Sequence, residues 1–175
     1  MTLLLTAMLL TTPVLDQTAT PAGNPTVASI RGTMDLVKGY LTKAAAQVPE
    51  DQYAFKPTPD VRSMGELFAH VADANFGICG AAGSEKPPMT GIEKSKKTKA
   101  EITQALTESF AFCEKVFDGI TDARANEVVK FFLPGTNTRL GVLAFNGAHA
   151  FEHYGNVVTY MRLKGMVPPS SAKGM

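Results

Sequence analysis

The sequence predicts an all-α protein, folded as an antiparallel four-helix bundle with long crossover connections. Four stretches carry apolar residues at alternating spacings of three and four, and they span residues 25–48, 64–80, 99–118 and 138–164. This spacing places the apolar side chains on one face of a helix. Segments rich in Pro and Gly separate the stretches, and no convincing pair of strands lies between them. Amphipathic helices of this length bury their apolar faces by packing into a bundle.

Each stretch has recognisable start or stop signals. Asn24 and Pro25 suit the N-cap and first position of the first helix. The segments 63–66 and 98–101 both read as capping boxes, in which two side chains satisfy each other's free backbone N–H groups. Gly119 and Gly165 are suited to end the third and fourth helices. The last stretch is apolar nearly all round, so we expect it to be the most buried helix, and 128–133 is either a short strand or an apolar loop.

The composition is that of one globular domain. The chain has 175 residues, of which 45% are hydrophobic and 19% are charged. A formal net charge of +1 argues against nucleic acid or an anionic membrane as a partner. We expect a basic cluster in the connection before the third helix to be solvated surface; it consists of Lys94, Lys96, Lys97 and Lys99. An apolar surface on such a bundle could also support a homodimer.

The N-terminal segment differs from the rest of the chain. Leu3 to Leu15 is an apolar run, too short for a stable membrane span, which needs about 20 apolar residues. It is similar to the core of an export signal, although no Lys or Arg precedes it, and this predicts a periplasmic or secreted protein. The alternative is an arm that packs on the domain or a partner subunit of a cytoplasmic protein. We therefore expect residues 1–23 to lie outside the folded domain, 24–170 to form the bundle and 171–175 to be a tail.

The two cysteines, Cys79 and Cys113, fall in different predicted helices. Two cysteines do not make a disulfide framework, so we expect buried free thiols. A single disulfide is the alternative if the protein is exported, since the sequence does not give the distance between the two residues.

The three histidines of the chain form the main functional candidate. His149 and His153 are four residues apart, so both lie on one face of the last helix. His70 belongs to the inward side of the second helix. If these helices pack together, three imidazoles can bind one divalent metal ion and leave a fourth position open, as in reactive metal sites. Zinc, nickel, copper and iron all suit imidazole ligands. The alternative is that they are hydrogen-bonded core residues without a metal.

The segment 149–153 also matches the inverted zinc-protease motif, in which the glutamate is the general base. That class takes another ligand from an acidic residue downstream, and residues 154–175 contain no Asp or Glu. We therefore reject a protease. Glu152 then either points to solvent or a neighbouring helix, or supports a metal ligand.

The arrangement resembles the DinB/YfiT-like superfamily over roughly residues 26–170. The resemblance rests on Glu66-Leu67-Phe68-Ala69-His70, on His149-x-x-x-His153-Tyr154-Gly155-Asn156, on Tyr160-Met161-Arg162 with Gly165 and Pro168-Pro169, and on Tyr53-x-Phe55-Lys56-Pro57. It implies a four-helix bundle with a metal site at His70, His149 and His153. Asn156 departs from the pattern, because a glutamine is expected there.

The resemblance also suggests a reaction class. Relatives include metal-dependent transferases and isomerases that use low-molecular-weight thiols such as bacillithiol or mycothiol. By this analogy the chain is a thiol transferase that binds a small-molecule thiol, although an exported protein fits poorly with thiols that are mainly intracellular. The alternative is a metal-binding or small-molecule-binding stress module without turnover. Tyr154, Asn156 and Arg162 could line or support the pocket, and Arg162 could equally pair with an acid. We see no DNA-binding surface.

Overall fold

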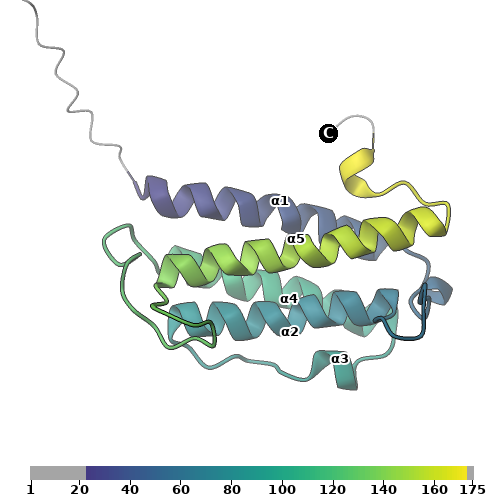
Figure 1. Cartoon of the computed structure of the whole chain (residues 1–175), viewed down its shortest axis with the longest axis horizontal. Helices are drawn as coiled ribbons and strands as arrows, with labels where there is room; N and C mark the ends of the chain where they lie inside the picture. Colours follow the sequence, from purple (N-terminus) through teal and green to yellow (C-terminus); the bar gives the residue numbers. More distant parts are fainter. Residues whose placement is uncertain (1–22, 173–175) are drawn as a thin grey trace, which may run out of the picture.

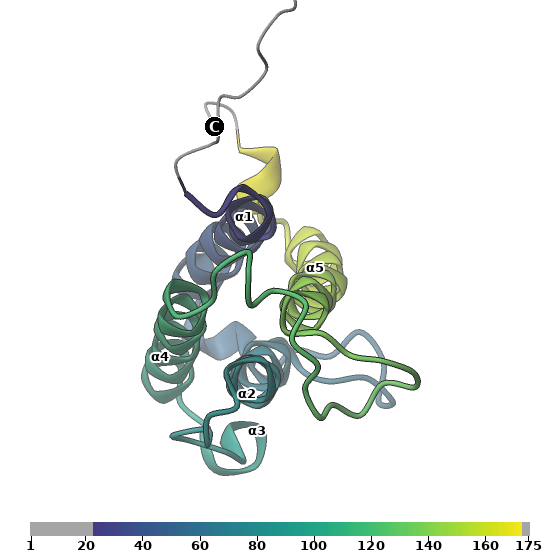
Figure 2. The ribbon, with the colours of Figure 1, turned by 90° about the vertical axis from the view of Figure 1, so that its left-hand side faces the viewer.

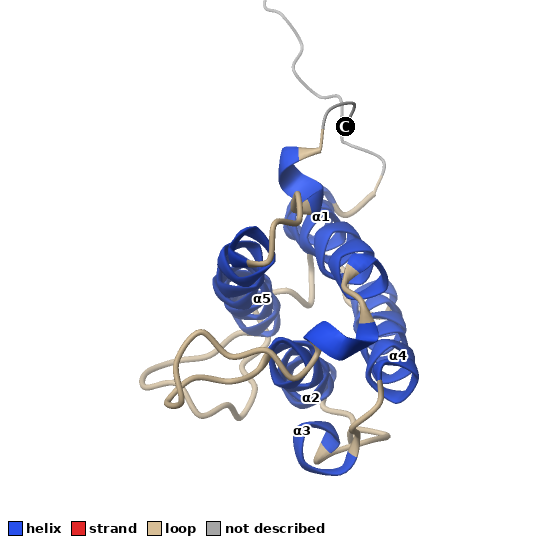
Figure 3. Cartoon of the chain, turned by 90° about the vertical axis from the view of Figure 1, so that its right-hand side faces the viewer, coloured by secondary structure: helices blue, strands red, loops and turns tan. Residues whose placement is uncertain are grey.

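The computed structural model describes residues 23–172, and every regular element in this range is a helix (Figures 1 and 3). The export-signal prediction falls on residues that lie outside the described range. Four long helices form the bundle: α1 (Pro25–Gln47), α2 (Met64–Gly83), α4 (Lys99–Asp118) and α5 (Arg139–Leu163). Three short elements accompany them: η1 (Glu50–Gln52), α3 (Ile92–Ser95) and η2 (Pro169–Ser171). The predicted four-helix bundle is confirmed.

The predicted helix start signals are present, except that a residue other than the predicted one caps α1. Both capping boxes form, at Ser63 before α2 and at Thr98 before α4. Asn24 occupies the expected N-cap position of α1, but its side chain does not cap the helix. The carboxylate of Asp122 does so instead, accepting the backbone N–H groups of Thr26 at 3.0 Å and Val27 at 2.9 Å. The loop after α4 therefore secures the start of α1.

The helices are not arranged as a simple antiparallel bundle. Viewed along the helices, α1, α4, α2 and α5 follow one another around a ring (Figure 2). Neighbours α2 and α4 run in the same direction, because Asn75 contacts Ser109 and Cys79 contacts Cys113. The pairs α1–α4 and α2–α5 run in opposite directions. Neighbours α1 and α5 also run in the same direction, because Met34 contacts Asn146 and Tyr40 stacks on Tyr154. The expectation of antiparallel neighbours is therefore wrong for α2–α4 and for α1–α5.

The parallel arrangement of α2 and α4, which follow one another in the chain, requires a long connection. Residues 84–98 return along the length of the bundle and carry the short helix α3 (Figure 1). The carboxylate of Asp73 in α2 accepts the backbone N–H groups of Ile92 and Glu93, each at 2.9 Å. Ile92 itself is fully buried. These contacts fix α3 against α2 at one height of the bundle, and they therefore fix the position of Glu93 relative to α2.

The most buried helix is α2, not α5. Thirteen of the 20 residues of α2 are buried, against ten of the 25 residues of α5. The prediction for the last helix is wrong because α2 is covered by α3 as well as by α4 and α5, whereas α5 packs mainly on α1 and α2. The segment 128–133 is a loop with one isolated bridge, Val128 to Thr138. None of the described helices is long and apolar enough to cross a membrane.

Cys79 of α2 and Cys113 of α4 form a disulfide, with their Cα atoms 5.3 Å apart. The expectation of free thiols is therefore wrong. Both cysteines are buried, next to a polar cluster at the centre of the bundle. In this cluster the side-chain N–H groups of Asn146 lie 3.0 Å from Asn75 Oδ1 and 3.3 Å from Cys79 Sγ. The disulfide links α2 to α4.

Candidate metal centre

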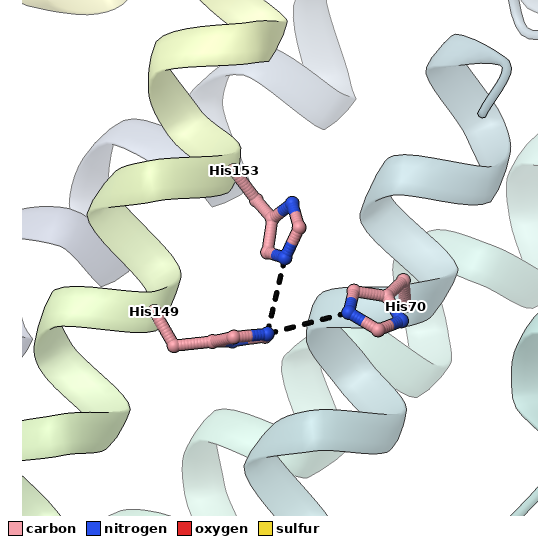
Figure 4. Close-up of side chains that lie close together, drawn as sticks. All are labelled: His70, His149 and His153. Atoms are coloured by element: carbon pink, nitrogen blue, oxygen red, sulfur yellow. Dashed lines mark hydrogen bonds between the residues drawn. The ribbon is translucent and has the colours of Figure 1, made fainter. Parts of the chain in front are cut away.

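The three histidines meet between α2 and α5, as the sequence predicts. Their rings point toward one another, and one ring nitrogen of His149 contacts both of the other rings (Figure 4). The Nε2 atom of His149 lies 3.3 Å from Nε2 of His70 and 3.0 Å from Nε2 of His153. His153 is buried, and the other two side chains are partly exposed. One ligand atom from each residue lies within 4.8 Å of the others, so the group could hold a metal ion.

A carboxylate from α3 holds His70 in one orientation. Oε2 of Glu93 lies 3.1 Å from Nδ1 of His70, and Oε1 accepts a hydrogen bond from Arg62 at 2.8 Å. Burial raises the pKa of Glu93, but the hydrogen bond and charge of Arg62, followed by those of His70, outweigh it and hold the pKa below its ordinary value. Glu93 is therefore ionised at neutral pH and can only accept. Nδ1 of His70 must carry the hydrogen, which leaves a lone pair on Nε2.

The position of this hydrogen decides whether the three rings can satisfy one another's hydrogen bonds without a metal ion. The three Nε2 atoms face one another, and His70 Nε2 has no hydrogen to donate. If His149 donates to it, His149 has no lone pair left for His153, so neutral imidazoles cannot satisfy all the contacts. A divalent cation would accept a lone pair from each ring. Ligand nitrogens about 2.0–2.1 Å from a tetrahedral zinc lie about 3.3 Å apart, close to the separations found here. The donor set therefore fits a divalent ion.

His149 and His153 remain neutral over a wide pH range. Burial, followed by the charges of His153 and His70, lowers the pKa of His149 from 6.5 to about 4. Burial, followed by the charge of His70, lowers the pKa of His153 to about 4. Metal binding requires neutral imidazole, so protons compete weakly at these two positions. In contrast to His70, the buried Nδ1 atoms of His149 and His153 have no hydrogen-bond partner among the described residues.

Two cavities meet at the histidines. The first has a volume of about 590 Å³, includes His153 in its lining and is polar. Its charged residues are two cations and four carboxylates: Lys56, Arg62, Asp60, Glu66, Glu93 and Glu152. Lys56 pairs with Glu66 at 3.3 Å, and Arg62 pairs with Glu93. A hydrophilic ligand can therefore approach the histidines from this side.

The second cavity lies on the other side of the histidines and is apolar. It has a volume of about 670 Å³, and both His70 and His149 line it. The remaining lining comes from α2, α5 and the loop before α5: Ala74, Gly77, Ile78, Lys130, Phe131, Phe132 and Phe145. The histidines thus separate a polar cavity from an apolar one, and ligands can reach them from both.

Other residues singled out in the sequence have varied positions. Glu152 is exposed and lines the polar cavity, without a hydrogen bond to any of the three histidines. Asn156 also lines this cavity. Tyr154 instead stacks on Tyr40 and contacts Ser170, and Arg162 donates to Ser171 rather than to an acid. Neither Tyr154 nor Arg162 reaches a cavity beside the histidines.

The supporting carboxylate, Glu93, was not predicted. It lies in a connection that reads as a solvated loop because of the nearby lysines. In the sequence, only Gly91 before a short polar-apolar segment signals a change of structure, and this is too weak to predict a helix. In the structure, the backbone of Gly91 has a φ of 74°. The role of Glu93 depends on where the crossover passes α2, which is a property of the fold.

The fold and the site together define a helical-bundle protein with a histidine group suited to one metal ion. The sequence profile of the DinB superfamily matches residues 33–157, which is more than half of the chain. The chain therefore belongs to the DinB superfamily, as the sequence motifs suggested. No curated protein sequence is significantly similar to it.

Solved structures show the same fold at low sequence identity. A DinB-like protein from Bacillus cereus has a TM-score of 0.71 at 17% identity, covering 81% of this chain and 95% of its own. A conserved protein from Enterococcus faecalis has a TM-score of 0.65 at 19% identity, covering 78% and 95%. A DinB-like protein from Bacillus subtilis has a TM-score of 0.65 at 16% identity, covering 87% and 100%. At these identities the likeness concerns the fold alone.

Proposed function

We propose that His70, His149 and His153 bind one divalent ion, with zinc, nickel and iron as the candidates. The observation that carries this proposal is the convergence of three Nε2 atoms that neutral imidazoles cannot satisfy among themselves. Glu93 supports it by fixing the lone pair of His70 toward the other two rings. Carboxylate–histidine pairs of this kind are typical around metal ligands.

We further propose that the protein is a metal-dependent transferase that uses a low-molecular-weight thiol. When bound at an open site, a divalent ion lowers the pKa of a coordinating thiol and favours the nucleophilic thiolate. The protein's own contribution is access and orientation. Glu93 positions His70, and the polar cavity beside His153 suits the hydrophilic body of such a thiol.

The proposed reaction is a substitution on carbon. The thiol sulfur forms a bond to an electrophilic carbon of the second substrate, and the bond from that carbon to its leaving group breaks. The leaving group departs with the electron pair of that bond, and the thiol proton passes to solvent. No oxidant or reductant is needed.

A conjugation assay tests this proposal. The metal-loaded protein is mixed with 1-chloro-2,4-dinitrobenzene and, in turn, cysteine, glutathione, bacillithiol or mycothiol, and thioether formation is followed by absorbance. We expect at least one thiol to react faster than in buffer, and the increase to be absent in His149→Ala. Rates equal to those in buffer for every thiol would reject this transferase activity. An equal increase in His149→Ala would show that the activity does not depend on the histidine site.

A metal-binding or small-molecule-binding module without turnover is the second candidate. The buried Cys79–Cys113 disulfide favours it, because structural disulfides are typical of oxidising compartments, where low-molecular-weight thiols are scarce. Under this alternative, removal of the metal would mainly lower the free energy of unfolding. The conjugation assay distinguishes the two functions.

We also propose that the protein is exported to the periplasm or secreted. The apolar run from Leu3 to Leu15 supports this, and so does the disulfide, which is an independent observation. Fractionation of the source cells, with mass measurement of the protein recovered, tests the proposal. We expect an extracytoplasmic protein without free thiols; a cytoplasmic protein with two reactive thiols after denaturation would reject export.

A further inference from the structure

The apolar cavity is not explained by metal binding. Its aromatic wall is continuous with the histidines: the ring centroid of Phe145 lies 6.3 Å from that of His149 and 5.6 Å from that of Phe131. Ile78 of α2 forms another part of the lining and is 5% exposed. A molecule in this cavity would therefore contact apolar side chains along its body and the histidines at one end.

Two small residues of α2 line this cavity. Ala74 and Gly77 lie on the side of α2 that lines it. Gly77 is exposed, and a Cβ atom built on it would meet no atom within 4 Å, so the cavity is open to solvent beside this glycine. A larger side chain at this position can extend along the open side of the cavity without displacing the helix backbone.

The charge of the lining limits the kind of ligand. Lys130 is the only charged side chain among the residues that line this cavity, and no carboxylate does so. The polar cavity on the other side carries six charged groups. Cavities of about 300–1,000 Å³ with mostly apolar linings are typical of sites for small organic molecules. The volume of about 670 Å³ falls within this range.

We propose that the apolar cavity binds the uncharged, apolar body of an organic ligand whose reactive end lies at the histidines. In the transfer proposed above, on which this assignment rests, that ligand is the electrophile. An aromatic or branched aliphatic body would pack against Ile78, Phe131 and Phe145. The hydrophilic thiol and the apolar electrophile then approach the histidines from opposite sides, each through the cavity that matches its polarity.

A cavity-filling variant tests this assignment. Gly77→Leu inserts a branched side chain into the open space and also favours the helix, because glycine is a poor helix former. Gly32→Leu is the matched control: Gly32, like Gly77, is exposed in a helix with nothing within 4 Å of its Cβ position, but it lies on α1 and does not line the cavity. Metal content and helical content are measured for both variants and are expected to equal those of the wild type.

The first readout is binding of the uncharged fluorescent probe N-phenyl-1-naphthylamine. We expect one probe per chain in the wild type and in Gly32→Leu, and an affinity lower by about tenfold or more in Gly77→Leu. Equal affinities in all three proteins would overturn the assignment. Probe binding that weakens as the protein concentration rises would also overturn it, because a second copy of the chain would then cover the cavity.

The second readout separates this assignment from the proposed function. With the reactive thiol, kcat/KM is compared for 1-chloro-2,4-dinitrobenzene and the small polar electrophile iodoacetamide. We expect the ratio of the two to fall by about tenfold in Gly77→Leu and to stay constant in Gly32→Leu. A metal-dependent reaction with an unchanged ratio would reject the assignment and leave the transferase standing. No reaction with either electrophile, together with probe binding lost in Gly77→Leu, would reject the transferase and support the cavity as a ligand site.

Discussion

Oε2 of Glu93 lies 3.1 Å from Nδ1 of His70, and this contact determines which nitrogen of His70 faces the other two histidines. Without the carboxylate, either tautomer of His70 would be accessible, and only one has a lone pair on Nε2. The pair joins α3 to α2, so the crossover between α2 and α4 contributes to the site. Carboxylates in this position commonly strengthen metal binding at the histidine that they contact.

The first prediction concerns Glu93. The change Glu93→Gln should lower metal affinity on the order of 10–100-fold, because the neutral amide no longer fixes the tautomer of His70 or raises its basicity. Competition with a metal-binding dye measures the affinity. Glu152→Gln is the matched control, because it removes the same charge from the same cavity but no contact with a histidine. Equal affinities for the two variants would show that the Glu93–His70 contact does not contribute to metal affinity.

A second prediction concerns Asp73, which contacts none of the histidines but holds the start of α3. Asp73→Ala should lower metal affinity roughly tenfold, because Glu93 is then no longer held against His70. Asp60→Ala, which removes a carboxylate of the polar cavity that caps no helix, should have a smaller effect. If the affinity of Asp73→Ala equals that of the wild type, α3 does not need this anchor.

The metal-free protein should lose stability in acid as His149 and His153 become protonated. The pKa of His149 and of His153 is about 4 in the folded protein, while the unfolded chain binds these protons near pH 6.5. Between these values the unfolded state holds more protons, so the free energy of unfolding falls as the pH drops from about 6.5 to about 4. Above about pH 6.5 this contribution is fully present.

Urea unfolding at a series of pH values measures this effect. The double variant His149→Ala/His153→Ala lacks both groups, so its pH dependence between 4 and 6.5 should be flatter than that of the wild type. Parallel pH profiles would mean that these histidines are as accessible to protons in the folded protein as in the unfolded chain. Carboxylate titration is common to both proteins and cancels in the comparison.

The disulfide should stabilise the fold substantially. It closes a loop with a sequence separation of 34 residues between α2 and α4. Replacing both cysteines by alanine should lower the free energy of unfolding by about 2–4 kcal/mol, since the unfolded chain regains conformational freedom. Denaturant unfolding of the oxidised wild type, the reduced wild type and the double variant measures this. Identical midpoints for the oxidised and reduced wild type would contradict it.

Much of the fold could be predicted because its signals are local. The capping boxes at Ser63 and Thr98 act within four residues, and the apolar spacing defines the buried face of each helix. The relative direction of α2 and α4 could not be predicted, because it depends on the path of a 15-residue crossover, 84–98, rather than on either helix. The cap that Asp122 provides to α1 is likewise a contact between distant segments.

The same distinction applies to the site. His149 and His153 share a helical face by spacing alone, and His70 lies on an inward face of its own helix, so their meeting follows once α2 and α5 are neighbours. Glu93 and the Cys79–Cys113 disulfide depend instead on which residues face each other across separate elements. The apolar cavity also depends on contacts between separate elements, because Gly77 of α2 and Phe131 of the loop come together only in the folded bundle.

Elemental analysis of the purified, untagged protein and of His149→Ala tests the central claim most directly. We expect one divalent ion per chain in the wild type and none in the variant, with the helical content of both unchanged by circular dichroism. Metal retained at full occupancy in His149→Ala would reject the histidine site. A wild-type protein that takes up no metal after incubation with zinc, nickel or iron would mean that the three histidines are core residues without a metal-binding role.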